Sequence, residues 1–125
     1  MGNPTPDDVA AAVAAAPLKM VATLPNSQRE VVMAELTGRQ EMDSAMEAGQ
    51  NDTADGRLRL IWAQSMRSCY SIAGERFDSS EHTADSFRAL FSAKDFGFVV
   101  ELFMLTNRPS DADAATFRES AKATV

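Results

Sequence analysis

The chain has 125 residues, a length that fits one domain. Hydrophobic residues make up 45% of it and charged residues 24%, which is the balance of a globular protein. Its formal net charge of −6 repels phosphate, and none of its apolar runs reaches the roughly 20 residues that cross a bilayer, so neither nucleic acid nor membrane is an expected partner. The single cysteine excludes an intramolecular disulfide and fits the reducing cytoplasm, where we expect the protein.

Residues 1–18 are rich in alanine and predict a short N-terminal helix. Thr5 is placed to cap its N-terminus, and Pro6 occupies the first helical position, where a missing N–H costs nothing. Pro17 ends the alanine run. Small side chains bury little surface, so whether this helix packs on the body stays open.

Residues 19–36 predict a small β-hairpin, because two runs of β-tolerant residues flank the turn residues 25–27. In the second run Val31 and Met33 would lie on one face, with their neighbours on the other. A helix from Gln28 onward is the alternative, since the same run also tolerates helical geometry.

Residues 37–107 predict a helical body, and its first helix opens with a capping box formed by Thr37 and Gln40. Gly49 supplies the stop for this helix. Adaptable binding surfaces use methionine, but core packing is the stronger interpretation for the methionines at helical spacing. These are Met42, Met46, Met66 and Met104.

The segment "GRLRLIWAQSMRSCYSI", residues 56–72, is predicted to form the first long helix, with a single apolar stripe, and Gly74 closes the link that follows. The stripe consists of Leu58, Ile61, Trp62, Met66, Cys69 and Tyr70. A second capping box, Asp78 with Glu81, then predicts the start of another helix, and Phe77 is placed as its hydrophobic staple.

The stretch 94–107 is apolar from Phe96 to Leu105 except for Gly97 and Glu101. A buried strand is the alternative, but the length and the cap before it, Ser92 with Asp95, favour a helix that is contacted on two sides. One face would hold Phe96, Val99, Val100 and Phe103. The neighbouring face would hold Phe98, Leu102 and Leu105.

Residues 108–125 predict a C-terminal helix or tail, which Ser110 caps. The whole chain, 1–125, is therefore expected to form one domain of the α+β class, mostly helical. A small N-terminal β-hairpin would be followed by a bundle of about four to five helices.

No catalytic, cofactor-binding or metal-binding residue emerges from the sequence, and we do not expect an enzyme. His82 has no Cys or His partners at zinc-ligand spacing, and a hydrated position in the first helical turn explains it. Cys69 lies on an apolar stripe, where a buried structural thiol is the stronger interpretation than a nucleophile. The glycines form no phosphate-binding loop.

The order of features between Met20 and Asn107 resembles the tail assembly chaperones of tailed bacteriophages. The first part is "MVATLPNSQREVVMAELTGRQEMDSAM", with a Leu-Pro turn, a Val-rich strand and a Leu-Thr-Gly step into a helix. The middle part is "LRLIWAQSMRSCYSIAGERFDSSEHTADSF", and the last is "FRALFSAKDFGFVVELFMLTN", which is similar to the closing helix pair of the family.

The resemblance implies a non-catalytic protein that coats the tape measure protein, keeps it soluble and assists tail tube assembly, with the major tail protein as a further partner. It implies a place in the host cytoplasm during assembly and absence from the mature virion. This chain would be the short form, made without the frameshift that adds a C-terminal domain in many phages. Self-association is compatible with this role.

Such a chaperone needs an exposed apolar groove with a polar rim. The candidate partner-binding residues are Phe91, Phe98, Leu102 and Leu105, and each of them also fits a core position. We expect Leu102→Asp to abolish client binding and leave the chain folded. Three other functions stay open: a structural tail or head–tail connector subunit retained in the virion, a small regulatory protein-binding module, and, against the expectation above, a small enzyme that uses Cys69 and His82.

Overall fold

The computed structural model describes residues 18–49 and 53–121, so the predicted helix of residues 1–18 lies outside this range except for its last residue. No helix among the described residues is long and apolar enough to cross a membrane. The elements are β1 (Lys19–Thr23), β2 (Glu30–Ala34), α2 (Gly38–Ala48), α3 (Ala54–Ser68), β3 (Cys69–Ile72), β4 (Glu75–Arg76), the 3₁₀-helix η1 (Ser79–Glu81), α4 (Ala84–Arg88), α5 (Ala93–Asn107) and α6 (Asp111–Ser120).

The predicted hairpin is confirmed as the antiparallel pair β1–β2, in which Val21 lies opposite Val32. Val31 and Met33 are fully buried on the face that carries the core, as the alternation predicted. The alternative of a helix from Gln28 onward is wrong: Gln28 has a positive φ of 62° in the turn.

The hairpin is only half of the sheet, which has four antiparallel strands in the order β1-β2-β3-β4. The structure corrects the predicted long helix, because α3 ends at Ser68 and the chain continues directly into β3. Cys69 and Tyr70 therefore belong to a strand. The free edge of β2 offers backbone N–H and C=O groups that β3 satisfies, a long-range gain that helical periodicity does not report.

Tyr70 is an extra residue in β3, because Cys69 pairs with Met33 and Ser71 pairs with the adjacent Val32. The turn between β3 and β4 uses Ala73 at φ 53° and Gly74 at φ 83°. This left-handed pair suits a tight hairpin, although only the glycine takes it without a steric cost.

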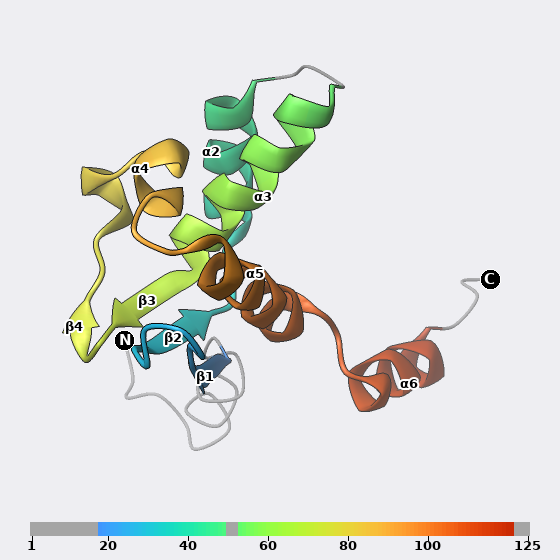
Figure 1. The fold of residues 1–125 in the computed structure, drawn as a ribbon. Coiled ribbons are helices and arrows are strands. Elements are labelled where there is room, and N and C mark those ends of the chain that lie inside the picture. The colour runs from blue at the N-terminus through green and yellow to red at the C-terminus, as the bar shows by residue number, and fades with distance from the viewer. Residues whose placement is uncertain (1–17, 50–52, 122–125) are drawn as a thin grey trace, which may run out of the picture.

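Helix α5 packs on β1 and β2, and α3, which leads directly into β3, packs against α4 and α5 (Figure 1). Helix α5 is confirmed as a helix and contacts both β1 and β2. Aromatic rings fill the centre: Phe87 lies 5.2 Å from Phe91 and 6.1 Å from Phe96 between ring centroids. The buried cluster consists of Leu24, Val31, Met33, Met66, Cys69, Phe87, Phe91, Phe96, Val99 and Leu102.

The predicted second capping box is misplaced by five residues. Asp78 caps the 3₁₀-helix η1, while α4 starts after Thr83, which forms a capping box with Ser86. Phe77 packs against Phe87 at a centroid distance of 5.3 Å, so it still anchors this segment to the core.

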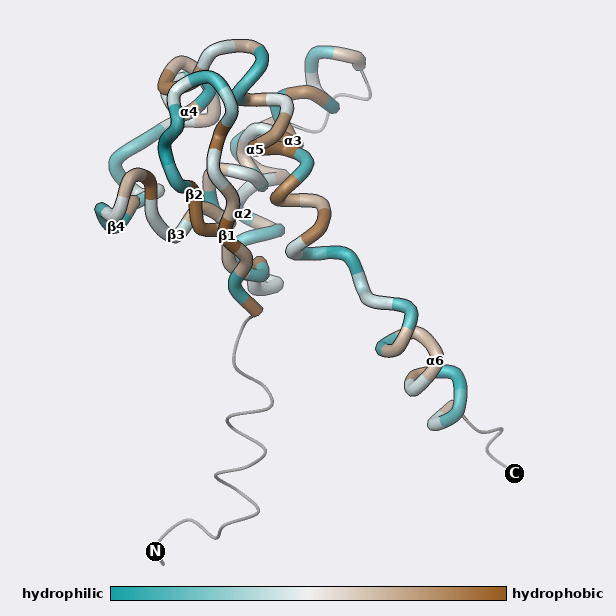
Figure 2. The backbone as a smooth tube through the Cα atoms, turned by 60° about the horizontal axis from the view of Figure 1, so that its bottom comes forward, coloured by the Kyte–Doolittle hydropathy of each residue, from teal (hydrophilic) through white to brown (hydrophobic). Residues whose placement is uncertain are grey.

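Helix α6 stands apart from the rest of the described chain in both views (Figures 1 and 2). Its N-terminus has the predicted Ser110 cap, completed as a capping box by Asp113. No residue of α6 is buried, and Phe117 is 71% exposed.

Candidate functional site

The structure divides the four candidate partner-binding residues into two pairs. Phe91 and Leu102 belong to the core, and each is only 5% exposed. Phe98 and Leu105 are 47% and 49% exposed on the outer side of α5. The binding role of this second pair stays a prediction.

The predicted grouping of Leu102 with Phe98 and Leu105 on one shared face is therefore corrected. Positions 98, 102 and 105 are helical neighbours, but the packed side of α5 is wide enough to take in the middle one. The residues buried along α5 are Asp95, Phe96, Val99, Leu102, Phe103 and Thr106.

A line of exposed side chains follows the outer side of α5, which we call the α5 outer stripe. It consists of Lys94, Phe98, Glu101, Leu105 and Arg108, spaced alternately four and three residues apart. Within α5 this spacing keeps Lys94, Phe98, Glu101 and Leu105 on one side of the helix, opposite the buried residues, and Arg108 follows as the C-cap. The stripe alternates charged and apolar groups, and the 51%-exposed Met104 widens its apolar area.

A groove of about 670 Å³ lies at the C-terminal end of the α5 outer stripe. Leu105 forms one wall, and Leu18 and Met20 of the β1 region form the other. Charged and polar groups line its remaining sides: Glu35, Thr106, Asn107, Arg108, Ser110, Asp111 and Asp113, with Pro109 between them. The end of the stripe thus has apolar walls and a polar rim.

Asn107 fixes this end of α5 to the sheet. Its side-chain oxygen accepts a hydrogen bond from the Leu36 N–H at 2.8 Å, and its amide group donates to Ser68 Oγ at 3.2 Å. The same amide also donates to the Phe103 carbonyl, which ties it to its own helix. These bonds hold the groove walls in a defined position.

Asp95 fixes the other end of α5. It is buried, and its two carboxylate oxygens accept hydrogen bonds from the backbone N–H groups of Asn26 at 2.8 Å and Ser27 at 3.0 Å. Burial opposes ionisation of this carboxyl, but the donors in the β1–β2 turn outweigh it and lower its pKa. The sequence identified Asp95 only as a cap for α5.

Helix α2 carries a second exposed apolar area. Met42 and Met46 are 65% and 78% exposed, so the prediction that they pack in the core is wrong, as it is for Met104. Of the four methionines assigned to the core, only Met66 is buried.

The methionines of α2 point toward solvent because the polar side of the helix packs against α3 and the start of α4. Arg67 of α3 forms an ion pair with Glu47 at 2.8 Å and donates a hydrogen bond to Ser44 at 3.4 Å. Glu47 also accepts from the Ala84 N–H at the start of α4. The sequence signal for a buried polar side was the spacing of the polar residues at positions 40, 44 and 47, which places them on one side of α2. Polar residues at such spacing usually face solvent, so the signal pointed the other way.

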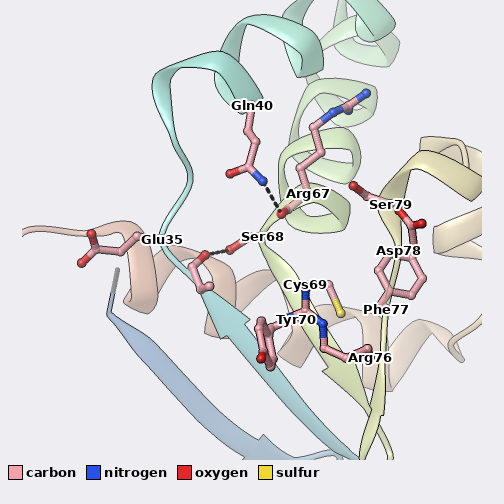
Figure 3. A pocket seen from close by; sticks show the side chains of 11 residues that line it. Glu35, Gln40, Arg67, Ser68, Cys69, Tyr70, Arg76, Phe77, Asp78 and Ser79 are labelled. Atoms are coloured by element: carbon pink, nitrogen blue, oxygen red, sulfur yellow. Dashed lines mark hydrogen bonds between the residues drawn. The ribbon is translucent and has the colours of Figure 1, made fainter. Parts of the chain in front are cut away.

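A polar pocket of about 510 Å³ lies between the end of α3, the strands β2 to β4 and η1 (Figure 3). Tyr70 lines the pocket. The Arg76 guanidinium lies over the Tyr70 ring at 3.6 Å from the ring centroid, and the Lys19 ammonium lies at 4.0 Å from it. The acidic groups of Glu35 and Asp78 line the same pocket, so its charge is mixed.

Cys69 and His82 do not assemble into a catalytic pair. Cys69 is buried, and burial raises the pKa of its thiol to about 12, which leaves almost no thiolate at neutral pH. His82 instead stacks on Phe77 at a centroid distance of 4.6 Å. In the described parts of the chain, no three His, Cys, Asp or Glu residues converge as metal ligands.

Comparison with known proteins gives no relative: no family model, no curated protein and no solved structure matches this chain.

Proposed function

We propose that this protein is a tail assembly chaperone of a tailed bacteriophage that binds the tape measure protein, keeps it soluble and assists tail tube assembly without catalysis. The order of sequence features from Met20 to Asn107 supports the family, and the α5 outer stripe supports the mode of action. The single observation that carries the proposal is the exposure of Phe98 and Leu105 on a helix whose opposite side is buried.

Half-exposed apolar side chains on a rigid helix suit reversible capture of a client. Complete burial of a large apolar side chain stabilises by about 1.5–3 kcal/mol, so covering the remaining halves of Phe98 and Leu105 contributes about 1 kcal/mol each. Several copies acting along one client would add these modest energies, whereas each single contact remains easy to release.

The partner class follows from the shape of the stripe. A line of alternating charged and apolar groups along α5 fits an amphipathic helix of the client laid alongside it. Exposed client helices of this kind aggregate when they are made alone, which is the hazard that the chaperone removes.

Co-expression with the tape measure protein tests the proposal. The wild-type chain is expected to bring the otherwise insoluble client into the soluble fraction and to co-purify in several copies. Phe98→Asp and Leu105→Asp should each abolish this effect. Met46→Asp is the matched control, because it introduces the same charge at an exposed apolar position of another helix. A client that stays insoluble with the wild-type chain contradicts the proposal.

Purified virions separate the chaperone from a structural tail or head–tail connector subunit. Mass spectrometry of finished particles should detect no peptide of this chain if it acts only during assembly. Stoichiometric presence in the particle would instead assign it a structural role.

A further inference from the structure

Three charges on the α5 outer stripe are spaced by seven residues: Lys94, Glu101 and Arg108. Phe98 and Leu105 lie between them, so the stripe reads positive, apolar, negative, apolar, positive. None of the three charges forms an ion pair with any residue of 18–49 or 53–121. The stripe thus presents a pattern of charge without an intramolecular partner in the described chain.

Helix α6 carries the matching pattern at the same spacing. Asp111 and Arg118 are seven residues apart, Ala114 and Phe117 lie on the same side of the helix, and Ala121 follows as the C-cap. Arg118, like the stripe charges, has no ion pair within the described residues. Helices shorter than about 12 residues are marginal on their own in water, so a ten-residue helix with no buried side chain needs a partner surface.

The two patterns are complementary when the helices run antiparallel. Asp111 then lies beside Arg108, Arg118 beside Glu101, and Ala121 beside Phe98, because both charge pairs are separated by seven residues on each helix. The antiparallel arrangement also aligns the two helix dipoles favourably. We propose that the α5 outer stripe binds helix α6 of a second copy of this chain.

The linker explains why the occupant is a second copy and not the same chain. Only Arg108, Pro109 and Ser110 join α5 to α6. Arg108 is extended, at φ −83° and ψ 131°, which is the conformation that a following proline imposes. In this conformation α6 leads away from its own α5 (Figures 1 and 2). A helix held away on a short linker that contains proline is suited to exchange between copies.

This self-association concerns the chain alone and holds whether or not the stripe also binds a tape measure protein. If it does bind one, α6 of a neighbouring copy competes for the same surface.

Analytical ultracentrifugation of the full chain without any client tests the inference. The wild-type chain should associate as its concentration rises, and added salt should weaken the association. Glu101→Arg and Arg118→Glu replace attraction by repulsion, so each should weaken association at least about tenfold. The double variant, Glu101→Arg with Arg118→Glu, should restore it. Glu119→Arg is the control: it changes the net charge as Glu101→Arg does, but it lies on the other side of α6.

Disulfide trapping identifies the occupant. A chain with Phe98→Cys, mixed with a differently tagged chain with Ala121→Cys, should form a disulfide-linked heterodimer on mild oxidation, while Glu119→Cys in place of Ala121→Cys should not. The native Cys69 is buried and does not compete.

The inference is overturned if the wild-type chain is monomeric at all concentrations or if the double charge variant stays as weak as the single ones. It is also overturned if a single chain carrying both Phe98→Cys and Ala121→Cys forms only an intramolecular disulfide, since α6 would then cover its own α5.

Discussion

Replacing Leu102 or Phe98 by alanine distinguishes the two sides of α5. Leu102 is 5% exposed inside the core, and a buried Leu→Ala change removes packed methyl groups and leaves a cavity, which costs about 3 kcal/mol. Phe98 is 47% exposed, so its truncation to alanine removes a side chain that is only about half buried and costs about 1 kcal/mol.

Urea unfolding followed by circular dichroism measures both costs. For a chain of this size a slope of about 1.5–2 kcal/mol per molar urea is expected, so the midpoint should fall by about 1.5–2 M for Leu102→Ala. It should fall by only about 0.5–0.7 M for Phe98→Ala. Leu102→Asp, which would leave a charge in the core, is now expected to unfold the chain and not merely to block binding. Equal midpoints for the two alanine variants would refute this assignment of core and surface.

Three further predictions concern single groups. The pKa of Asp95 is lowered in the folded state, so its contribution to stability is present above the ordinary Asp pKa and is lost as the pH falls through the folded value. In urea titrations Asp95→Asn should therefore be less stable than the wild type at pH 7. The variant should also lose this part of the pH dependence of stability. Ala73→Gly should raise the free energy of unfolding by about 1 kcal/mol, because glycine takes the φ of 53° without strain; an unchanged or lower urea midpoint would contradict this. With a pKa of about 12, the Cys69 thiol should be about one part in ten thousand thiolate at pH 8 and react with a thiol reagent only after unfolding, so fast labelling of the native chain would be inconsistent with its burial.

The sequence predicted the elements whose signals are local. The hairpin β1–β2 followed from strand alternation around a turn, and the caps Thr37, Ser92 and Ser110 were each placed at the right residue. Each of these signals depends on residues within a few positions of one another, where backbone preference and capping act.

The elements that were mispredicted depend on long-range contacts. The end of α3 at Ser68 is set by pairing of β3 with a strand almost forty residues earlier in the chain. The outward face of α2 is set by the ion pair between Glu47 and Arg67, which makes the polar side of the helix the buried one. Sequence patterns within one helix do not report pairing or packing with a distant segment, so they could not predict either result.

The candidate site shows the same division. Patterning identified α5 as the helix with two apolar faces, but it could not tell which side the sheet covers, and so it grouped Leu102 with Phe98. The charges of the α5 outer stripe were visible at seven-residue spacing in the sequence. Their meaning depends on the exposure of that side and on the position of α6.

Oxidative footprinting of the complex with a tape measure protein tests most directly whether the α5 outer stripe holds the client. Hydroxyl radicals modify exposed Phe and Met side chains, and Phe98, Met104 and Met46 are all exposed in the free chain. Binding should strongly slow modification of Phe98 and Met104 and leave Met46 on α2 as reactive as before. Unchanged modification rates at Phe98 and Met104 in a complex that does form would contradict the account.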